Sequence, residues 1–468
     1  MSGINHQTPA SAKPRHIVVV VADSLRYDTT ETQRSRLSYL EENGTRFSEV
    51  RSAGCWTLPA HASLFTGRMP HEHGATSQTR TIRPDFPRLA EQLAEAGYHP
   101  YQITANVATT DIFDVDRGFL ETVKGWDLVR SGSGRLKRAL VMFGKPRVRR
   151  ILFKGDQIGQ KLAQDARVAT AWVKTTAPAM FRRARQIIRE HDRRGESCFL
   201  FLNLMETHFP YHVHTSFDIT AGDMADAISE LRGLFHTVNQ TFLRRGRLEL
   251  SKRVLRMLKR RQQRAFRLLA PEIDDFARHV HNEGDNLFVF LSDHGDNFGE
   301  QDWLYHFSNV TDAGNRTPLY WLDPAHGART APPGELATPV SARFLYHDIL
   351  RSAGINTDGP SLFSERPESL PIMQSYWYDN AGRTQPWFRS NRFAFVDGQD
   401  RYMHRGDGWF SAKVSNGSEP EFRPLPPDAM PIHDVVIDPE RRAYLEKTFS
   451  SFIDFSQSIP GSIGYKAG

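Results

Sequence analysis

The chain has 468 residues, a formal net charge of +6 and a sequence pI near 9.2. Its apolar and charged fractions are typical of a globular protein and exclude a fibrous or largely disordered chain. This length predicts one large domain with an appendage, or two domains. The mild basic excess favours an anionic substrate or an anionic surface as partner.

Cysteine content and hydropathy indicate in which cellular compartment the protein is expected. The only cysteines are Cys55 and Cys198, too few for a disulfide framework and compatible with a reducing environment. Residues 1–15 are polar and lack the apolar run of a signal peptide, and no segment is long and apolar enough to span a bilayer. We therefore expect a flexible N-terminus over residues 1–15 and a cytoplasmic protein.

Apolar runs predict the strands of a buried sheet. Residues 16–22, 197–204 and 285–291 are continuous β-branched, leucine and phenylalanine runs, typical of strands buried on both faces. Shorter strands are expected over 98–104 and from residue 316 onward. Helices are expected between them, several ending at a glycine, over residues 32–44, 86–97, 244–269 and 339–354. Later residues alternate in short runs that predict a small antiparallel sheet and a terminal helix over 444–455.

The stretch Cys-Trp-Thr-Leu-Pro-Ala-His-Ala-Ser-Leu-Phe-Thr-Gly, residues 55–67, places a hydroxyl next to a helix start. Thr57 closes a loop, and Pro59 fits the first turn of the helix that follows. Free backbone N–H groups and the positive end of the helix dipole favour an oxyanion at that place. The alternative is that Thr57 is an ordinary N-cap residue.

Polar residues follow three of the predicted strands. Asp23 comes directly after the first strand, His208 follows the second, and Asp293 and His294 follow the third. In a doubly wound sheet these strand ends share one edge, so the side chains are expected to converge. The carboxylate–imidazole pair suits Zn²⁺, Mn²⁺ or a similar cation, and His306 follows at loop distance. Each residue alone could be a cap or a structural histidine, but caps explain the whole set poorly.

Two basic stretches stand out, over residues 135–154 and 244–269. A solvated helix face is the favoured interpretation, and a basic lid over an anionic substrate or a peripheral membrane contact are the alternatives. No motif that reads nucleic acid is present in the second stretch.

Six motifs in this chain resemble, in order and spacing, those of the sulfatase family of the alkaline phosphatase superfamily. They are residues 20–28, 57–67, 70–74, 206–211, 292–300 with His306 after it, and 316–319. The resemblance extends over residues 16 to 360 and is loose in the basic insertions and the C-terminal part.

The resemblance implies an α/β fold, an alkaline-phosphatase-like α/β/α sandwich around a large, mostly parallel sheet, with a smaller C-terminal α+β subdomain. The expected boundaries are a catalytic domain over residues 16–345, with basic helical insertions at about 130–195 and 215–280, and a C-terminal subdomain over 346–468.

The family's site residues carry over to positions of this chain by the same resemblance. Thr57 takes the position of the nucleophile, and Asp23, Asp293, His294 and Thr57 itself take positions of metal ligands. His208 and His306 take the family's other catalytic positions, which contact the transferred group or protonate the leaving group. His61 and His212 are expected to bind substrate.

The chain departs from the family pattern at the nucleophile. Classical sulfatases have a cysteine or serine that is oxidised to formylglycine and followed by Pro-x-Arg, where this chain has Thr57 and His61. Threonine cannot yield that aldehyde because its β-carbon already bears a methyl group. Cys55 is two positions early and lacks the proline context, and Ser24 replaces an aspartate of a many-oxygen Ca²⁺ site. The pattern instead resembles the superfamily's phosphodiesterases and phosphotransferases, which use an unmodified threonine.

The sequence therefore predicts a metal-dependent hydrolase that cleaves a phosphate or sulfate ester through Thr57 and a covalent intermediate, with a phosphate mono- or diester favoured. The alternatives are a sulfuric ester hydrolase, a phospho-group transferase at a membrane surface and a non-catalytic anion-binding relative. The expected cofactor is a divalent ion, Mn²⁺, Zn²⁺, Mg²⁺ or Ca²⁺. One ion is favoured, and a second would be held by His208 and His212. The oligomeric state stays open.

Overall fold

A nine-stranded sheet forms the centre of the molecule. The computed structural model describes residues 13–77, 79–129, 175–209, 211, 252–306, 309–323, 333–364, 372–376, 391–406, 408–413, 423–436 and 438–458. The strand order is β10 (Gly334–Leu336), β2 (Thr45–Arg51), β9 (Arg316–Leu322), β6 (Leu287–Leu291), β1 (Ile17–Ala22), β5 (Ser197–Leu204), β3 (Tyr98–Thr104) and β4 (Glu121–Lys124), with β11 (Val340–Ser341) beside β2. Neighbouring strands are parallel except where β9 pairs with β2 and β6. The predicted strands are confirmed.

Each central strand is buried on both faces because its side chains alternate between two apolar cores. In β1, Ile17, Val19 and Val21 belong to one core, whereas Val18 and Val20 belong to the other. The continuous β-branched run thus supplies both faces of one strand, which explains why the sequence shows no polar alternation there.

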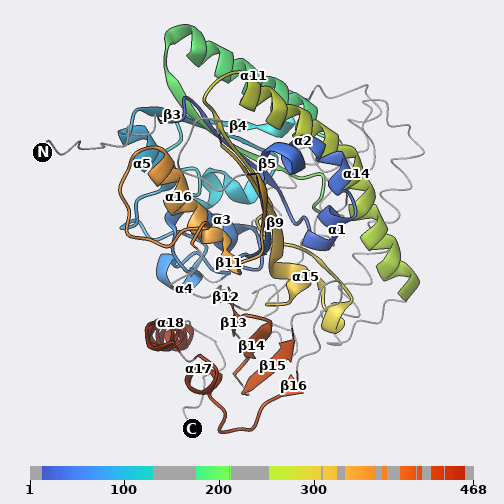
Figure 1. The fold of residues 1–468 in the computed structure, drawn as a ribbon, viewed down its shortest axis with the longest axis vertical. Coiled ribbons are helices and arrows are strands. Elements are labelled where there is room, and N and C mark those ends of the chain that lie inside the picture. The colour runs from blue at the N-terminus through green and yellow to red at the C-terminus, as the bar shows by residue number, and fades with distance from the viewer. Residues whose placement is uncertain are drawn as a thin grey trace, which may run out of the picture.

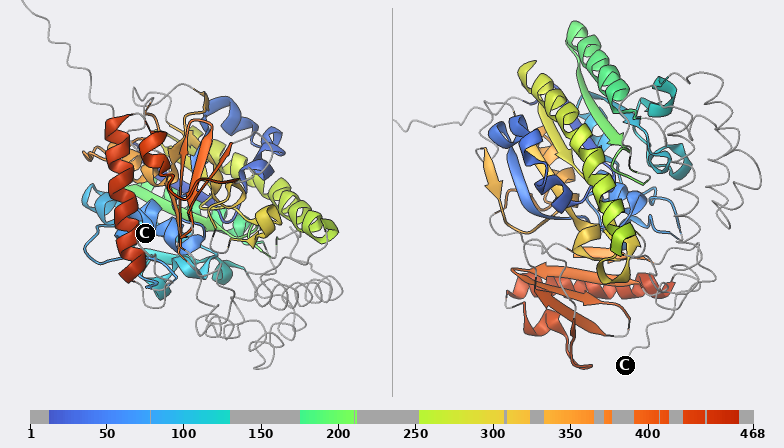
Figure 2. Two further views of the ribbon diagram at one scale, coloured as in Figure 1. Left: turned by 90° about the horizontal axis from the view of Figure 1, so that it is seen from below. Right: turned by 90° about the vertical axis from the view of Figure 1, so that its right-hand side faces the viewer.

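Helices cover both faces of the sheet (Figure 1). One face packs against α3 (Thr57–Thr66), α5 (Leu89–Glu95) and α16 (Leu345–Ser352). The opposite face packs against α2 (Ser38–Asn43), α11 (Ala177–Arg194) and α14 (Lys252–Asn282), and the last two lie side by side (Figure 2). Shorter helices are α1 (Tyr27–Glu31), α4 (Pro70–His73), α6 (Gly125–Leu128) and α15 (Asp312–Asn315), and β7 (Asn297–Phe298) with β8 (Leu304–Tyr305) forms a hairpin. The expected α/β/α sandwich is confirmed.

A second, antiparallel sheet lies at the C-terminal end of the chain (Figures 1 and 2). Its strands are β12 (Ile372–Ser375), β13 (Arg392–Asp397), β14 (Asp400–His404), β15 (Trp409–Lys413) and β16 (Arg423–Pro424), in that order. One face packs on α17 (Pro431–Asp434) and α18 (Pro439–Ser458) through an aromatic core that includes Phe393, Trp409 and Phe452. This is the antiparallel sheet and terminal helix that the alternating runs predicted.

Several predicted helices have different bounds in the structure. Residues 32–44 form a 3-10 turn followed by the short α2, rather than one helix. The helix expected over 339–354 begins only at Leu345, because Val340 and Ser341 form a short strand that pairs with β2. The helix expected over 244–269 continues to Asn282, and residues 244–251 lie outside the described residues.

The basic stretch 135–154 also lies outside the described residues, so its expected role stays a prediction. Among the helices within the described ranges, none is both long enough and apolar enough to cross a membrane.

Candidate metal centre and nucleophile

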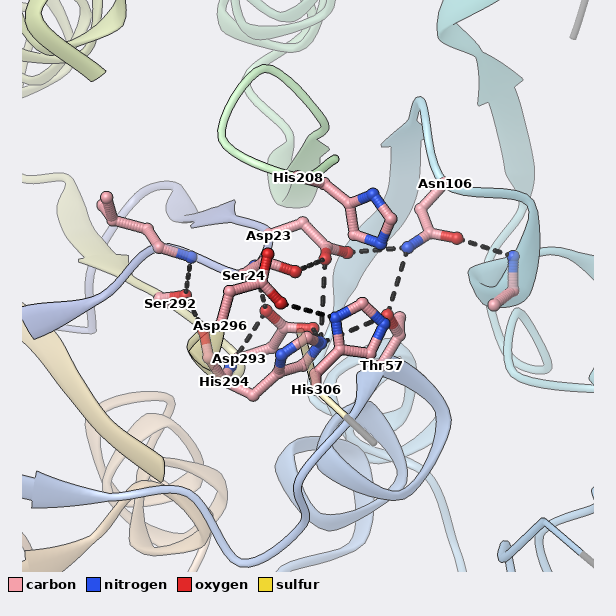
Figure 3. A network of polar contacts seen from close by, with 12 residues as sticks. Asp23, Ser24, Thr57, Asn106, His208, Ser292, Asp293, His294, Asp296 and His306 are labelled. Carbon is pink, nitrogen blue, oxygen red and sulfur yellow. Dashed lines mark hydrogen bonds and ion pairs between the residues drawn. The ribbon is translucent and has the colours of Figure 1, made fainter. Parts of the chain in front are cut away.

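Four adjacent parallel strands deliver polar side chains to one edge of the sheet. The strands β6, β1, β5 and β3 are neighbours in that order, and their carboxyl ends lie together. Asp293 follows β6, Asp23 follows β1, His208 follows β5 and Asn106 follows β3. Figure 3 shows these side chains pointing toward one another, with Thr57 reaching them from the N-terminus of α3. The edge that the sequence predicted is the place where polar groups converge.

Asp23, Asp293 and His294 form a group whose ligand atoms all lie within 4.8 Å of one another. All three side chains are buried. His294 Nδ1 lies 3.0 Å from the carbonyl oxygen of Gly295, which can only accept, so Nδ1 carries the proton. His294 Nε2 therefore presents a lone pair, 3.4 Å from Asp293 Oδ2 and 3.7 Å from Asp23 Oδ1.

This arrangement brings together three electron-rich atoms and fits a cation between them. Asp293 Oδ2 is buried and accepts no hydrogen bond within the described part of the chain. Burial, and next the charge of Asp23, raises the pKa of Asp293 well above its usual range. Two carboxylates and a neutral imidazole are a ligand set for Zn²⁺ or Mn²⁺. The positive charge of a bound ion would offset the repulsion between the buried carboxylates of Asp23 and Asp293.

Asp23 differs from Asp293 because its oxygens are well partnered. Its Oδ2 accepts hydrogen bonds from the side-chain amides of Asn106 at 2.6 Å and Asn203 at 3.3 Å. Burial alone would raise the pKa of Asp23, but the adjacent histidines His208 and His294, together with these bonds, hold it at about 2. Asp23 is thus favoured in its charged form, unlike Asp293.

Thr57 is the first residue of α3, and the preceding Trp56 occupies the N-cap position in an extended conformation. The hydroxyl makes no capping bond. It lies 3.4 Å from His294 Nε2 and 3.3 Å from the Asn106 amide, so it faces the candidate metal ligands. The alternative that Thr57 is an ordinary N-cap is therefore wrong, because Trp56 holds the N-cap position.

His61 lies one helical turn beyond Thr57 and is fully buried beneath it. Its Nε2 accepts from the Asn203 amide at 3.0 Å, which leaves Nδ1 to donate to the carbonyl oxygen of Thr57 at 3.0 Å. The ring packs edge-on against Phe65 and Phe201. Nδ1 also lies 3.4 Å from Asp293 Oδ2, so His61 borders the candidate metal group. This buried position suits a residue that orients the first turn of α3, and the expected contact between His61 and substrate stays a prediction.

His208 and His306 lie next to each other at the open side of the group, with ring centroids 5.1 Å apart. His306 Nδ1 lies 2.7 Å from Asp296 Oδ1, and Asp296 Oδ2 accepts from the Tyr211 hydroxyl at 2.8 Å. Burial opposes the ionisation of Asp296, but His306 beside it lowers its pKa. His208 Nδ1 in turn faces the carbonyl oxygen of Phe209 at 2.8 Å.

A second group of close ligand atoms consists of His294, Asp296 and His306. It shares His294 with the first group, and its Asp296 carboxylate already binds His306 and Tyr211. The two groups therefore overlap, and the expected number of ions stays a prediction. His212, which was expected to bind substrate or a second ion, lies outside the described residues.

Sequence reasoning missed Asn106, Asn203 and Asp296, and left Arg26 without a role. Asn106 follows a correctly predicted strand by two residues, so the rule that found Asp23 could have found it.

Arg26 Nη1 donates to the backbone oxygen of Asp296 at 2.9 Å and to Glu300 at 2.8 Å, and its Nε donates to Asp28. Arg26 therefore fixes the loop after β6 that carries the candidate ligands, a role that only the folded contacts reveal.

A sequence model of the sulfatase family matches residues 15–355 of the chain, which is most of its length. No curated protein matches the sequence significantly.

Solved structures with the same fold cover nearly the whole chain at low identity. Phosphonate monoester hydrolase SpPMH from Silicibacter pomeroyi is 17% identical, with a TM-score of 0.59, over 93% of this chain and 94% of its own. The phosphonate monoester hydrolase of Agrobacterium radiobacter is 16% identical, with a TM-score of 0.57, over 95% of this chain and 96% of its own. BT4656, solved with its substrate D-glucosamine-2-N,6-O-disulfate, is 13% identical, with a TM-score of 0.55, over 95% and 99%. At these identities the likeness concerns the fold alone.

Proposed function

The chain belongs to the sulfatase family, whose members hydrolyse sulfate and phosphate esters, and we propose that it cleaves a phosphate ester with the unmodified Thr57 hydroxyl as nucleophile. One observation carries the proposal. The Thr57 hydroxyl lies 3.4 Å from the lone pair of His294 Nε2, beside two buried carboxylates that need a cation. A threonine at this position cannot become formylglycine, so the reactive atom is the hydroxyl oxygen itself.

Asp23, Asp293 and His294 would hold the divalent ion, and their mixed oxygen and nitrogen atoms favour Mn²⁺ or Zn²⁺ over Ca²⁺. When bound, this ion lowers the pKa of the Thr57 hydroxyl and polarises an oxygen of the ester. The Asn106 amide, 3.3 Å from the Thr57 hydroxyl, is placed to donate a hydrogen bond to an oxygen of the bound phosphoryl group.

The reaction would proceed in two in-line displacements. Thr57 gives its hydroxyl proton to solvent, and its Oγ forms a bond to phosphorus as the bond to the leaving alkoxide breaks. His306 Nε2 donates a proton to that alkoxide, because Asp296 holds the Nδ1–H and stabilises the imidazolium. Water then attacks phosphorus, returns a proton to His306 Nε2, and Thr57 leaves and regains its own proton. His208 lies close enough to share this role.

The test compares the metal-dependent turnover of an aryl phosphate monoester, an aryl phosphodiester and an aryl sulfate by the full chain. We expect a phosphate ester to be preferred, Thr57→Ala to lose at least about 10³-fold in kcat, and Thr57→Ser to retain measurable turnover because it keeps the hydroxyl. Mass spectrometry of a quenched reaction should find phosphate on the peptide that contains residue 57. A preference for the sulfate ester would refute the phosphate assignment, and full activity of Thr57→Ala would refute the nucleophile.

A further inference from the structure

A second cluster of metal-ligand side chains lies at the opposite edge of the central sheet. His99 is at the start of β3, His191 is in the last turn of α11, and Glu196 precedes β5. The connection between α11 and β5 forms the upper end of the molecule in Figure 1, whereas the C-terminal sheet forms the lower end. Since β5 runs from Ser197 to the carboxyl edge, the two clusters are separated by about 23 Å of strand, at about 3.3 Å per residue.

We propose that His99, His191 and Glu196 bind a divalent transition-metal ion such as Zn²⁺, independently of the catalytic centre. Their ligand atoms all lie within 4.8 Å of one another. Two imidazoles and one carboxylate form a three-residue ligand set for Zn²⁺, and the partial exposure of His99 and Glu196 leaves a fourth position for water.

The contact between His191 and Glu196 has the geometry of two ligands around one ion. His191 Nδ1 lies 2.9 Å from Glu196 Oε2, yet neither atom takes part in a well-directed hydrogen bond within the described residues. Two ligand atoms about 2.0 Å from a common ion stand roughly 3 Å apart. His191 is only 2% exposed, so its unpartnered nitrogen is aimed into the protein rather than into bulk water.

The second nitrogen of His191 has the partner that metal-binding histidines commonly have. His191 Nε2 lies 3.1 Å from the Tyr101 hydroxyl, which fixes the ring and frees Nδ1 for an ion. The His99 ring lies against the His191 ring, with centroids 4.9 Å apart and a tilt of 37°. Burial, and next His99, lowers the pKa of His191, which keeps its imidazole in the neutral form that binds a metal.

The competing explanation for the position of Glu196 is a surface ion pair with Arg194 that involves no metal ion. Arg194 Nη1 lies 3.8 Å from Glu196 Oε2, but the Arg194 side chain is 60% exposed and such a pair contributes little. A bound ion would join β3, α11 and the start of β5 at the edge that has no catalytic residue among the described ones. It would therefore act on stability and not on turnover.

The experiment counts zinc in the full chain after chelation and dialysis against a small excess of Zn²⁺. We expect two ions in the wild type and one each in His99→Gln, in Glu196→Gln and in Asp293→Asn, which removes only the catalytic-edge ion. His433→Gln is the matched control, because His433 also faces a glutamate, Glu446, at 3.0 Å but lies in the C-terminal unit. It should keep both ions.

A thermal readout separates binding here from binding at the catalytic edge. In the Asp293→Asn background, Zn²⁺ at about 100 times its Kd should raise Tm by about 3 °C, and adding His99→Gln should remove that rise. An unchanged zinc count in both His99→Gln and Glu196→Gln would overturn the proposal, as would loss of all zinc from Asp293→Asn alone. Neither result depends on whether Thr57 is the nucleophile.

Discussion

Asp293→Asn should stabilise the metal-free protein while abolishing its activity. The carboxylate is fully buried, and its Oδ2 accepts no hydrogen bond within the described structure, whereas Oδ1 accepts from the backbone N–H groups of Ser24 at 3.2 Å and His294 at 3.0 Å. Asparagine keeps the two Oδ1 bonds. Its new amide can donate across 3.4 Å to the lone pair of His294 Nε2. The change therefore removes the cost of ionising a buried carboxyl group beside Asp23, the cost that raises the pKa of Asp293. His61 Nδ1 is the other side-chain atom close to Oδ2, at 3.4 Å, and it stays beside the new amide.

The expected gain is about 1–3 kcal/mol in the free energy of unfolding, the usual cost of a buried polar group left without a partner. An entropy of unfolding of about 2.1 cal/mol/K per residue converts this gain to about 1–3 °C in Tm for a chain of this length. Excess Mn²⁺ or Zn²⁺ should reverse the order, because the wild type gains about 2.7 kcal/mol at 100 times its Kd and the variant binds more weakly. The assay is thermal unfolding in chelator and in metal.

Asp296→Asn is the matched control, because its carboxylate is as buried but fully partnered by His306 and Tyr211. It should lose about 1–2 kcal/mol in chelator, since two charge-assisted hydrogen bonds are weakened. The two substitutions, three positions apart, should thus have opposite signs. Metal-free Asp293→Asn that unfolds at or below the wild-type Tm would refute the argument that Asp293 lacks a partner without an ion.

Two further predictions concern a contact that the sequence did not reveal and a buried histidine far from the metal group. Asn106→Ala should lower kcat by about 10²-fold, because its amide is the hydrogen-bond donor nearest the Thr57 hydroxyl. Asn203→Ala is the control and should lower kcat less, because Asn203 contacts Asp23 and His61 instead. Equal losses of kcat in the two variants, measured in steady state, would contradict this prediction. His73 accepts from the Ala75 N–H at Nδ1, and burial, then His71, lowers its pKa to about 3. The folded state excludes a proton that the unfolded state binds below pH 6.5, so the free energy of unfolding should fall by about 1.4 kcal/mol per pH unit from 6.5 towards 3 on this account alone. His73→Asn should flatten urea-measured stability against pH by that slope, and an unchanged slope would show that His73 titrates normally.

The sequence predicted the sheet well because the information lies in short, local runs. The apolar runs ending at Ala22, Leu204 and Leu291 each supply a strand buried on both faces, and burial of such strands requires helices on either side. Parallel neighbours then bring their carboxyl ends to one edge, so the meeting of Asp23 with Asp293 and His294 followed from topology.

The sequence could not predict what depends on side-chain direction. His61 follows Thr57 by four residues, so a helix places both on one face. The sequence did not show that the His61 ring is fully buried against Phe201, with Nδ1 3.4 Å from Asp293 Oδ2. The start of α16 was missed for a similar reason, because Val340 pairs with a strand nearly 300 residues earlier, Val50 in β2. Neither contact leaves a signal in local periodicity.

The residues of the candidate centre are held in place in two different ways. Asp23, Asp293 and His294 follow adjacent strands of one sheet, so their relative positions are fixed by backbone pairing before any ion binds. Thr57 comes from a helix instead, and its orientation depends on the His61 bond to its carbonyl oxygen and on the Asn106 amide. The candidate ligand set is therefore built into the sheet, whereas Thr57 is oriented by His61 and Asn106. Both also connect to Asp23, His61 through Asn203 and Asn106 directly. Asp23 links both supports, because it belongs to the candidate ligand group and its Oδ2 accepts from the same Asn106 amide that donates to the Thr57 hydroxyl.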